Sequence, residues 1–138
     1  MNKNLQAYGK ENIKSQIAGA DSYTIIKMLM QGALDRLAQG KGFLERKDLH
    51  GKSKSLSGAA AIIKALNESL DFNAGSDAVE NLSSLYEYMD ERISDATINN
   101  TTDPIVEVIS LLSEIKSAWD EIPSSEVEKA LAIQASQG

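Results

Sequence analysis

Apolar side chains recur at alternating steps of three and four along most of the chain, which is the pattern of amphipathic helices. A first helix is expected to begin at Asp21 or Ser22, because both residue types are good N-caps. Gly40 and Gly42 interrupt its pattern, so we expect the helix to bend or fray there. Its predicted core-facing residues are Ile26, Leu29, Met30, Ala33, Leu37 and Leu44.

Two further helices follow a polar connection over residues 45–55. The second helix is expected to stop by residues 73–75, where Asn-Ala-Gly breaks the pattern. The third opens at Asp77, and Glu80 lies three residues later in the spacing of a capping box. Their predicted core seams are Leu56, Ala59, Ile63, Leu66 and Leu70, then Leu82, Leu85, Met89, Ile93 and Ala96.

The fourth helix has the clearest start in the chain. Asp103 is expected to cap it, Pro104 suits the first helical position, and Pro123 stops it. A short last helix is expected over residues 125–135. The seam of the fourth helix is Ile105, Val108, Leu112, Ile115, Trp119 and Ile122.

Four helices with short links predict an all-α fold, an antiparallel four-helix bundle. No segment alternates apolar and polar residues over a useful length, so β structure is not expected. Residues 1–20 are polar and mixed, and we interpret them as an irregular N-terminal arm. Residues 21–138 are expected to form a single helical-bundle domain that includes the short C-terminal helix.

Several helices carry more apolar residues than one stripe requires. One interpretation is a wide core with scattered surface residues. The other is an exposed groove that binds an apolar helix from a partner. The residues outside the predicted seams include Ile25, Met28, Ile62, Ala65, Tyr86, Tyr88, Val106, Ile109 and Leu111. Among these, the predicted partner contacts are Ile62, Ala65, Tyr86, Val106 and Ile109.

Composition narrows the classes of function. The 138 residues have a formal net charge of −6, which argues against nucleic-acid binding. The absence of cysteine excludes disulfides, thiol catalysis and thiolate metal sites. Residues 1–20 lack the apolar core of a signal peptide, and no stretch approaches the about 18 apolar residues of a membrane span. We therefore expect a cytoplasmic protein of the cytosol, without membrane insertion.

The motifs of catalysis and metal binding do not occur in the chain. A di-iron bundle needs Glu-x-x-His pairs, but His50 is the one histidine and has no Glu three residues before it. Gly51, Lys52 and Ser53 resemble the end of a phosphate loop, yet the first glycine of that motif would fall at Arg46. We therefore expect no catalytic residue, no metal site and no cofactor.

A cluster of cations surrounds Gly51 and is interpreted as a solvated connection that can also receive an acidic partner. It comprises Lys41, Arg46, Lys47, Lys52 and Lys54. His50 beside it leaves a second function open, because histidine phosphotransfer domains are also helical bundles. Those domains resemble His-x-Leu-Lys-Gly, whereas this chain has His50-Gly51-Lys52-Ser53-Lys54, so the order differs.

The order of several short segments is more specific than any one of them. They are Met28-Leu29-Met30-Gln31-Gly32-Ala33-Leu34, Leu66-Asn67-Glu68-Ser69-Leu70-Asp71, Asn81-Leu82, Leu85-Tyr86-Glu87-Tyr88-Met89 and Ala118-Trp119. Together they resemble the flagellar export chaperones of the FliS type, from about Leu5 to Ile122.

The resemblance implies a protein that is not an enzyme. Such chaperones bind the C-terminal segment of flagellin, prevent its premature polymerisation and deliver it to the flagellar export apparatus. The family's N-terminal arm lies near the cargo groove, and Leu5 and Tyr8 match its apolar and tyrosine positions. A third interpretation remains open, in which the extra apolar residues form a homodimer.

Overall fold

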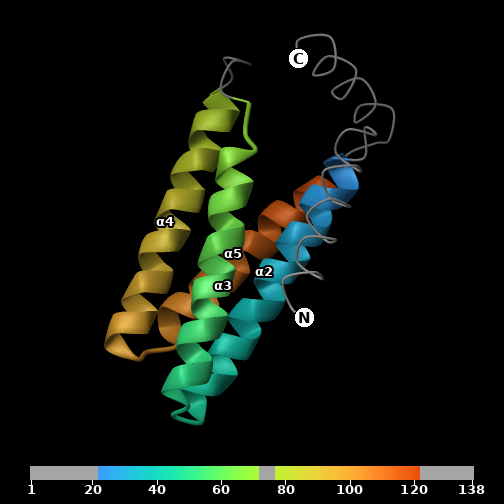
Figure 1. The fold of residues 1–138 in the computed structure, drawn as a ribbon. Coiled ribbons are helices and arrows are strands. Elements are labelled where there is room, and N and C mark those ends of the chain that lie inside the picture. The colour runs from blue at the N-terminus through green and yellow to red at the C-terminus, as the bar shows by residue number, and fades with distance from the viewer. Residues whose placement is uncertain (1–21, 72–76, 122–138) are drawn as a thin grey trace.

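The structure, a computed structural model, describes residues 22–71 and 77–121 and contains four α-helices in these ranges. Each helix packs against the next, and α2 also packs against α5, so the helices form a closed ring in the order α2, α3, α4, α5 (Figure 1). The prediction of an all-α four-helix bundle is confirmed. The helices are α2 (Ser22–Glu45), α3 (Leu49–Glu68), α4 (Asp77–Asn99) and α5 (Asp103–Asp120).

The core is built from one apolar stripe of each helix. Most residues of the predicted seams are buried there, and each large side chain contributes roughly 1.5–3 kcal/mol by leaving water. The core includes Met30, Ala33, Leu37 and Leu44 of α2; Leu56, Ala59, Ile63 and Leu66 of α3; Tyr86, Met89, Ile93 and Ala96 of α4; and Ile105, Val108 and Leu112 of α5. Ile26, Leu29, Leu70, Leu82, Ile115 and Trp119 pack against this cluster and are partly buried.

A glycine allows α2 and α3 to approach closely. A Cβ atom at Gly40 would lie 2.5 Å from Leu56 Cδ2, so a larger residue would collide with the core. The helix continues through Gly40 and Gly42 to Glu45, and it does not end at these residues. The close packing offsets the roughly 1 kcal/mol that a glycine costs inside a helix.

The connection between α2 and α3 is shorter than the sequence predicts. The chain turns over residues 46–48, and Lys47 adopts a left-handed conformation with φ of 60°. Asp48 is the N-cap of α3, because its carboxylate accepts a hydrogen bond of 3.0 Å from the backbone N–H of Gly51. The expected connection over residues 45–55 is therefore wrong, since α3 begins at Leu49.

Lys52 belongs to the interior and not to a solvated connection. Its side chain is 6% exposed, and its Nζ donates hydrogen bonds to Thr97 O (3.0 Å) and Asn100 Oδ1 (2.6 Å). Both acceptors lie at the C-terminal end of α4, where carbonyl groups lack helical partners and attract a cation. Lys52 thus joins α3 to the end of α4.

On α4 the predicted seam is corrected by one position. Tyr86 is 2% exposed and belongs to the core, whereas Leu85, which was predicted to face inward, is 38% exposed. Leu82 to Met89 is two helical turns, and either Leu85 or Tyr86 fits between them. Burial raises the pKa of Tyr86 to about 12, so its hydroxyl stays protonated at physiological pH.

At the start of α5, Thr102 occupies the N-cap position and makes no side-chain capping bond. Asp103 is the first residue of the helix, so its predicted capping role is wrong by one residue, and Pro104 is the second helical residue instead of the first. Ile122, Pro123, the short helix expected over residues 125–135 and the arm over residues 1–20 lie outside the described residues. No helix in the described part is long and apolar enough to cross a membrane.

Candidate functional site

An aromatic clamp joins the first turn of α2 to the last turn of α5. The rings of Tyr23 and Trp119 stack with centroids 5.4 Å apart and planes inclined by 15°. The Tyr23 hydroxyl donates to Trp119 O (3.0 Å), and Trp119 Nε1 donates to Tyr23 O (3.1 Å). Two reciprocal bonds and a ring stack fix how these helices lie against each other at this end.

Ion pairs beside the clamp show which edges of α2 and α5 meet. Asp120 of α5 accepts from Lys116 (3.0 Å) and pairs with Lys27 of α2 (3.3 Å). The bond from Lys116, and then the one from Lys27, lowers the pKa of the Asp120 carboxyl below its ordinary value. The edge of α2 that contains Lys27 therefore lies next to the edge of α5 that contains Asp120.

Helical spacing extends both edges along the bundle. Gln31, Leu34 and Ala38 follow Lys27 at steps of four, three and four, and Ser113, Ile109 and Val106 precede Lys116 at steps of three, four and three. All of these side chains are exposed or half-buried, and none is charged. With Ser110 and Ser117 of the same helix, they form what we term the α2–α5 face: Gln31, Leu34, Ala38, Val106, Ile109, Ser110, Ser113 and Ser117.

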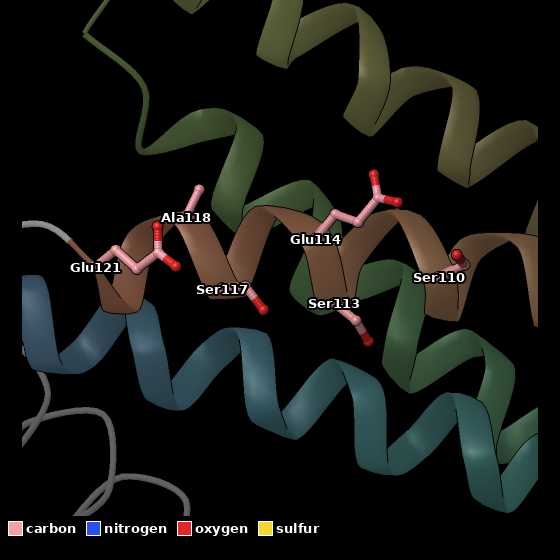
Figure 2. A pocket seen from close by; sticks show the side chains of 6 residues that line it. All are labelled: Ser110, Ser113, Glu114, Ser117, Ala118 and Glu121. Atoms are coloured by element: carbon pink, nitrogen blue, oxygen red, sulfur yellow. The ribbon is translucent and has the colours of Figure 1, made fainter.

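A shallow hollow of about 470 Å³ lies over the C-terminal half of α5, and it is lined by three serines, one alanine and two glutamates: Ser110, Ser113, Glu114, Ser117, Ala118 and Glu121. Figure 2 shows Ser113 and Ser117 turned toward α2, whereas Glu114 and Ala118 point to the opposite side of the helix. Val106 lies on the same helix, before the hollow, and is 48% exposed. The α2–α5 face therefore combines an accessible apolar side chain with small hydroxyl groups.

This arrangement suits the binding of a helix better than chemical catalysis. Small side chains let a second backbone approach closely, and hydroxyl groups cost less to dehydrate than carboxylates when the bound helix supplies them with hydrogen-bond partners. In the described part of the chain, no group of His, Cys, Asp or Glu is placed to hold a metal ion. His50 lies exposed in the first turn of α3, at one end of the bundle.

The outer surface of α4 has the opposite character. None of the exposed residues of α4 is basic. Five of them are acidic: Asp77, Glu80, Glu87, Asp90 and Glu91. On the edge of α4 that faces α5, Glu107 of α5 accepts hydrogen bonds from Arg92 Nε (2.7 Å) and from the Tyr88 hydroxyl (2.8 Å). These bonds lower the pKa of the Glu107 carboxyl, with the bond from Tyr88 as the larger cause. A protein segment that binds to the bundle is called the guest below. To bind on this surface, a guest would have to displace the water that strongly hydrates the carboxylates.

The structure divides the predicted contact residues among three places. Val106 and Ile109 lie together on the α2–α5 face. Ile62 is half-buried on α3, where its Cδ1 would lie 3.6 Å from a Cβ atom placed on Gly32 of α2, and Ala65 is exposed one turn later. Tyr86 lies in the core, so direct contact of its ring with a guest would require the bundle to open.

Two predicted contacts and three unpredicted ones complete the description of the site. Leu5 and Tyr8 lie outside the described residues. Ser110, Ser113 and Ser117 of the α2–α5 face do not stand out in an apolar pattern, because serine is polar. Their spacing of three and four on one helix is a signal that could have found them.

Comparisons with known proteins agree on one family. The family model described as Flagellar protein FliS matches residues 4–126. Flagellar secretion chaperone FliS of Vibrio cholerae is 39% identical over 123 residues, covering 89% of this chain and 90% of the relative. Flagellar secretion chaperone FliSB of Pseudomonas aeruginosa is 40% identical, with 87% and 95% covered. Flagellar secretion chaperone FliS of Salmonella typhimurium is 37% identical, with 86% and 88% covered.

Proposed function

The chain belongs to the FliS family of flagellar secretion chaperones, and from that premise we propose that it binds the C-terminal segment of flagellin in the cytoplasm. The bound segment would be kept from premature polymerisation and delivered to the flagellar export apparatus. This is a binding role that requires no catalytic group. The protein partner implied by the relatives' name is a flagellar protein, and flagellin is our specific assignment.

The observation that carries the proposal is the run of small and apolar side chains on the α2–α5 face, which Glu114 and Glu121 border in the same hollow. A segment that is disordered when free and apolar on one side needs a surface that can be dehydrated to receive it. Val106 and Ile109 supply apolar contacts, and Ser110, Ser113 and Ser117 permit close approach of a guest backbone. An amphipathic helix laid along α5 meets both requirements.

A longer guest segment could continue across α2 to the other groove of this helix. In the ring of helices, α2 lies between α5 and α3, and its second edge, at Gly32, lies near Ile62 of α3, one turn before the exposed Ala65. Met28 is exposed and lies four residues before Gly32, which puts it on the same side of α2, where it offers an adaptable apolar contact. Leu5 and Tyr8 remain proposed contacts of the arm, and Tyr86 would support the guest surface from within the core.

Titration calorimetry with flagellin tests the cargo assignment. The full chain is mixed with intact flagellin and, separately, with flagellin that lacks its C-terminal segment. We expect binding to the intact form and loss of binding to the truncated form. Equal affinity for both forms would contradict the assignment of the C-terminal segment, whereas no binding to either would contradict flagellin as the cargo.

Sedimentation of the free and loaded protein tests the homodimer interpretation. If the α2–α5 face serves a guest, the mass in solution should show one chain per flagellin segment across a wide range of concentration. A dimer that dissociates when flagellin is added would show that the same face serves self-association. A dimer that persists in the complex would place the self-contact elsewhere.

A further inference from the structure

The turn between α2 and α3 forms an exposed basic end of an otherwise acidic protein. We define the basic tip as Arg46, Lys47, Leu49, His50 and Lys54, all of which are exposed. They lie within one turn and the first two helical turns after it, at the lower end of the bundle in Figure 1. The chain as a whole has a net charge of −6, so this concentration of cations is an exception to its composition.

The carboxylates of the same segment already form an ion pair or a hydrogen bond within the chain. Glu45 pairs with Lys41 at 3.4 Å, and Asp48 accepts the capping bond from Gly51. Among the described residues, the side chains of Lys47 and Lys54 have no ion-pair partner. Their charges are therefore available to a group from outside the chain.

An apolar side chain lies within this basic segment. Leu49 is the first residue of α3 and is 56% exposed, although leucine normally contributes to a core. The surroundings hold the backbone in place, because Gly51 packs against the Phe43 ring and the Arg46 guanidinium lies 4.9 Å from the centre of that ring. The tip thus offers a fixed apolar contact with cations beside it.

We propose that the basic tip is a docking site for an acidic protein segment with one apolar side chain. The apolar side chain would cover Leu49, and carboxylates on either side would pair with Lys47 and Lys54. Apolar contact at the centre with charge pairs at the rim is the usual composition of a protein interface. This contact goes beyond the proposed flagellin binding and does not depend on it.

A nucleic acid is a poorer match for the same surface. Its binding draws on many phosphate contacts, and the net charge of −6 opposes the approach of a polyanion. An exposed leucine adds nothing to a phosphate contact. The two ligand classes therefore make different predictions for a change at Leu49.

Amide chemical shifts of the full-length, isotope-labelled protein test the proposal. The probes are a synthetic peptide of glutamate and aspartate with one central leucine, the same peptide with serine in place of that leucine, and a single-stranded oligonucleotide of equal charge. We expect the leucine peptide to shift resonances at the basic tip. The serine peptide should bind about tenfold more weakly, as the loss of a largely buried leucine contact implies.

Charge variants locate the contact. Lys47→Glu with Lys54→Glu should weaken binding of the leucine peptide about tenfold, because two favourable rim pairs become repulsive. These changes leave the packing of Arg46 against Phe43 in place. Lys64→Glu is the matched control, since Lys64 is an exposed cation farther along α3, and it should change the affinity less than twofold.

A second variant separates the apolar contact from charge attraction. Leu49→Ser should weaken the leucine peptide and leave the serine peptide unchanged, while the melting temperature stays near that of the parent. Shifts outside the tip, an equal effect of Lys64→Glu, or equal binding of the two peptides would each overturn the proposal. Tighter binding of the oligonucleotide would assign the tip to phosphate groups and would also overturn it.

Discussion

The α2–α5 face and the outer surface of α4 belong to one bundle, yet they differ in almost every property relevant to binding. The first has serines, a glutamine and partly exposed aliphatic residues, whereas the second presents five carboxylates. Both helices that form the first face, and α4 itself, bury an apolar stripe in the same core. The inner stripes thus determine the fold, and the outer residues determine where a guest can displace water.

The two sides of α5 also differ in the interactions that they make with the neighbouring helices. Toward α2, an aromatic clamp and the Asp120 ion pairs close the end of the helices. Toward α4, Glu107 holds Tyr88 and Arg92 at the surface. Changes on one side should therefore leave the other side intact, which makes matched variants informative.

The largest expected effect is on the α2 side. Trp119→Ala should lower the free energy of unfolding by about 3 kcal/mol, because it removes a packed ring and the bond from Trp119 Nε1 to Tyr23 O, while the Tyr23 hydroxyl keeps its backbone acceptor at residue 119. Tyr88→Phe on the α4 side removes one exposed bond and should change it by less than about 0.5 kcal/mol. Urea denaturation followed by circular dichroism measures both. A loss below about 1 kcal/mol for Trp119→Ala would show that the clamp adds little.

The next effect separates stability from guest binding. Lys52→Met should cost about 2 kcal/mol, because the carbonyl of Thr97 and the amide oxygen of Asn100 lose their charged donor. Lys54→Met is the matched control and should be nearly neutral, since Lys54 is exposed. Affinity for the flagellin segment should be unchanged in both variants. A parallel loss of affinity would show that α4 contributes to the guest surface.

A smaller effect tests the contrast in charge directly. Ser110→Glu on the α2–α5 face should weaken binding of the flagellin segment about tenfold, because a carboxylate would have to lose its water. Ser84→Glu introduces the same group on the exposed surface of α4 and should leave the affinity unchanged. Titration calorimetry of the two variants with the flagellin segment measures both affinities. If Ser84→Glu proves the more harmful, the guest surface has been assigned to the wrong side of the bundle.

The smallest effect is the pH dependence of two carboxylates of α5, Asp120 and Glu107. Hydrogen bonds donated by lysines lower the pKa of Asp120, and those donated by Tyr88 and Arg92 lower the pKa of Glu107. The folded state therefore binds fewer protons than the unfolded state near these values. The resulting stability is present above the unfolded pKa and is lost as pH falls through the folded pKa.

Carboxyl resonances followed through an acid titration measure both groups. Each midpoint should lie below the ordinary value, and added salt should move it back because both carboxylates are partly accessible to solvent. Asp120→Asn should abolish the contribution of the α2 side, and Glu107→Gln that of the α4 side. A midpoint at or above the ordinary value would contradict the corresponding set of bonds.

The fold could be predicted from the sequence because the apolar spacing is redundant. Leu56, Ala59, Ile63 and Leu66 repeat the same step, and all four are buried on α3. Where two neighbouring residues fit one position, the pattern cannot choose between them, as with Leu85 and Tyr86. Lys52 shows a different limit, since its acceptor Thr97 O is 45 residues away along the chain.

The candidate site could be predicted only in part for a related reason. Val106 and Ile109 are visible as apolar residues outside a seam, and both lie on the α2–α5 face. The serines beside them carry no apolar signal. Whether these serines line the guest surface depends on which edge of α5 faces α2. That edge is fixed by the contact between Lys27 and Asp120, which are far apart in sequence.

The clamp has a practical consequence, because Trp119 is the single tryptophan of the chain. Its indole is stacked on Tyr23 and hydrogen-bonded to backbone carbonyl oxygen, so its ultraviolet emission arises from one defined place in the molecule. A change of wavelength or intensity would therefore report separation of α2 from α5 without any attached dye. Trp119 is thus an intrinsic fluorescence probe of the contact between α2 and α5, the first and last described helices.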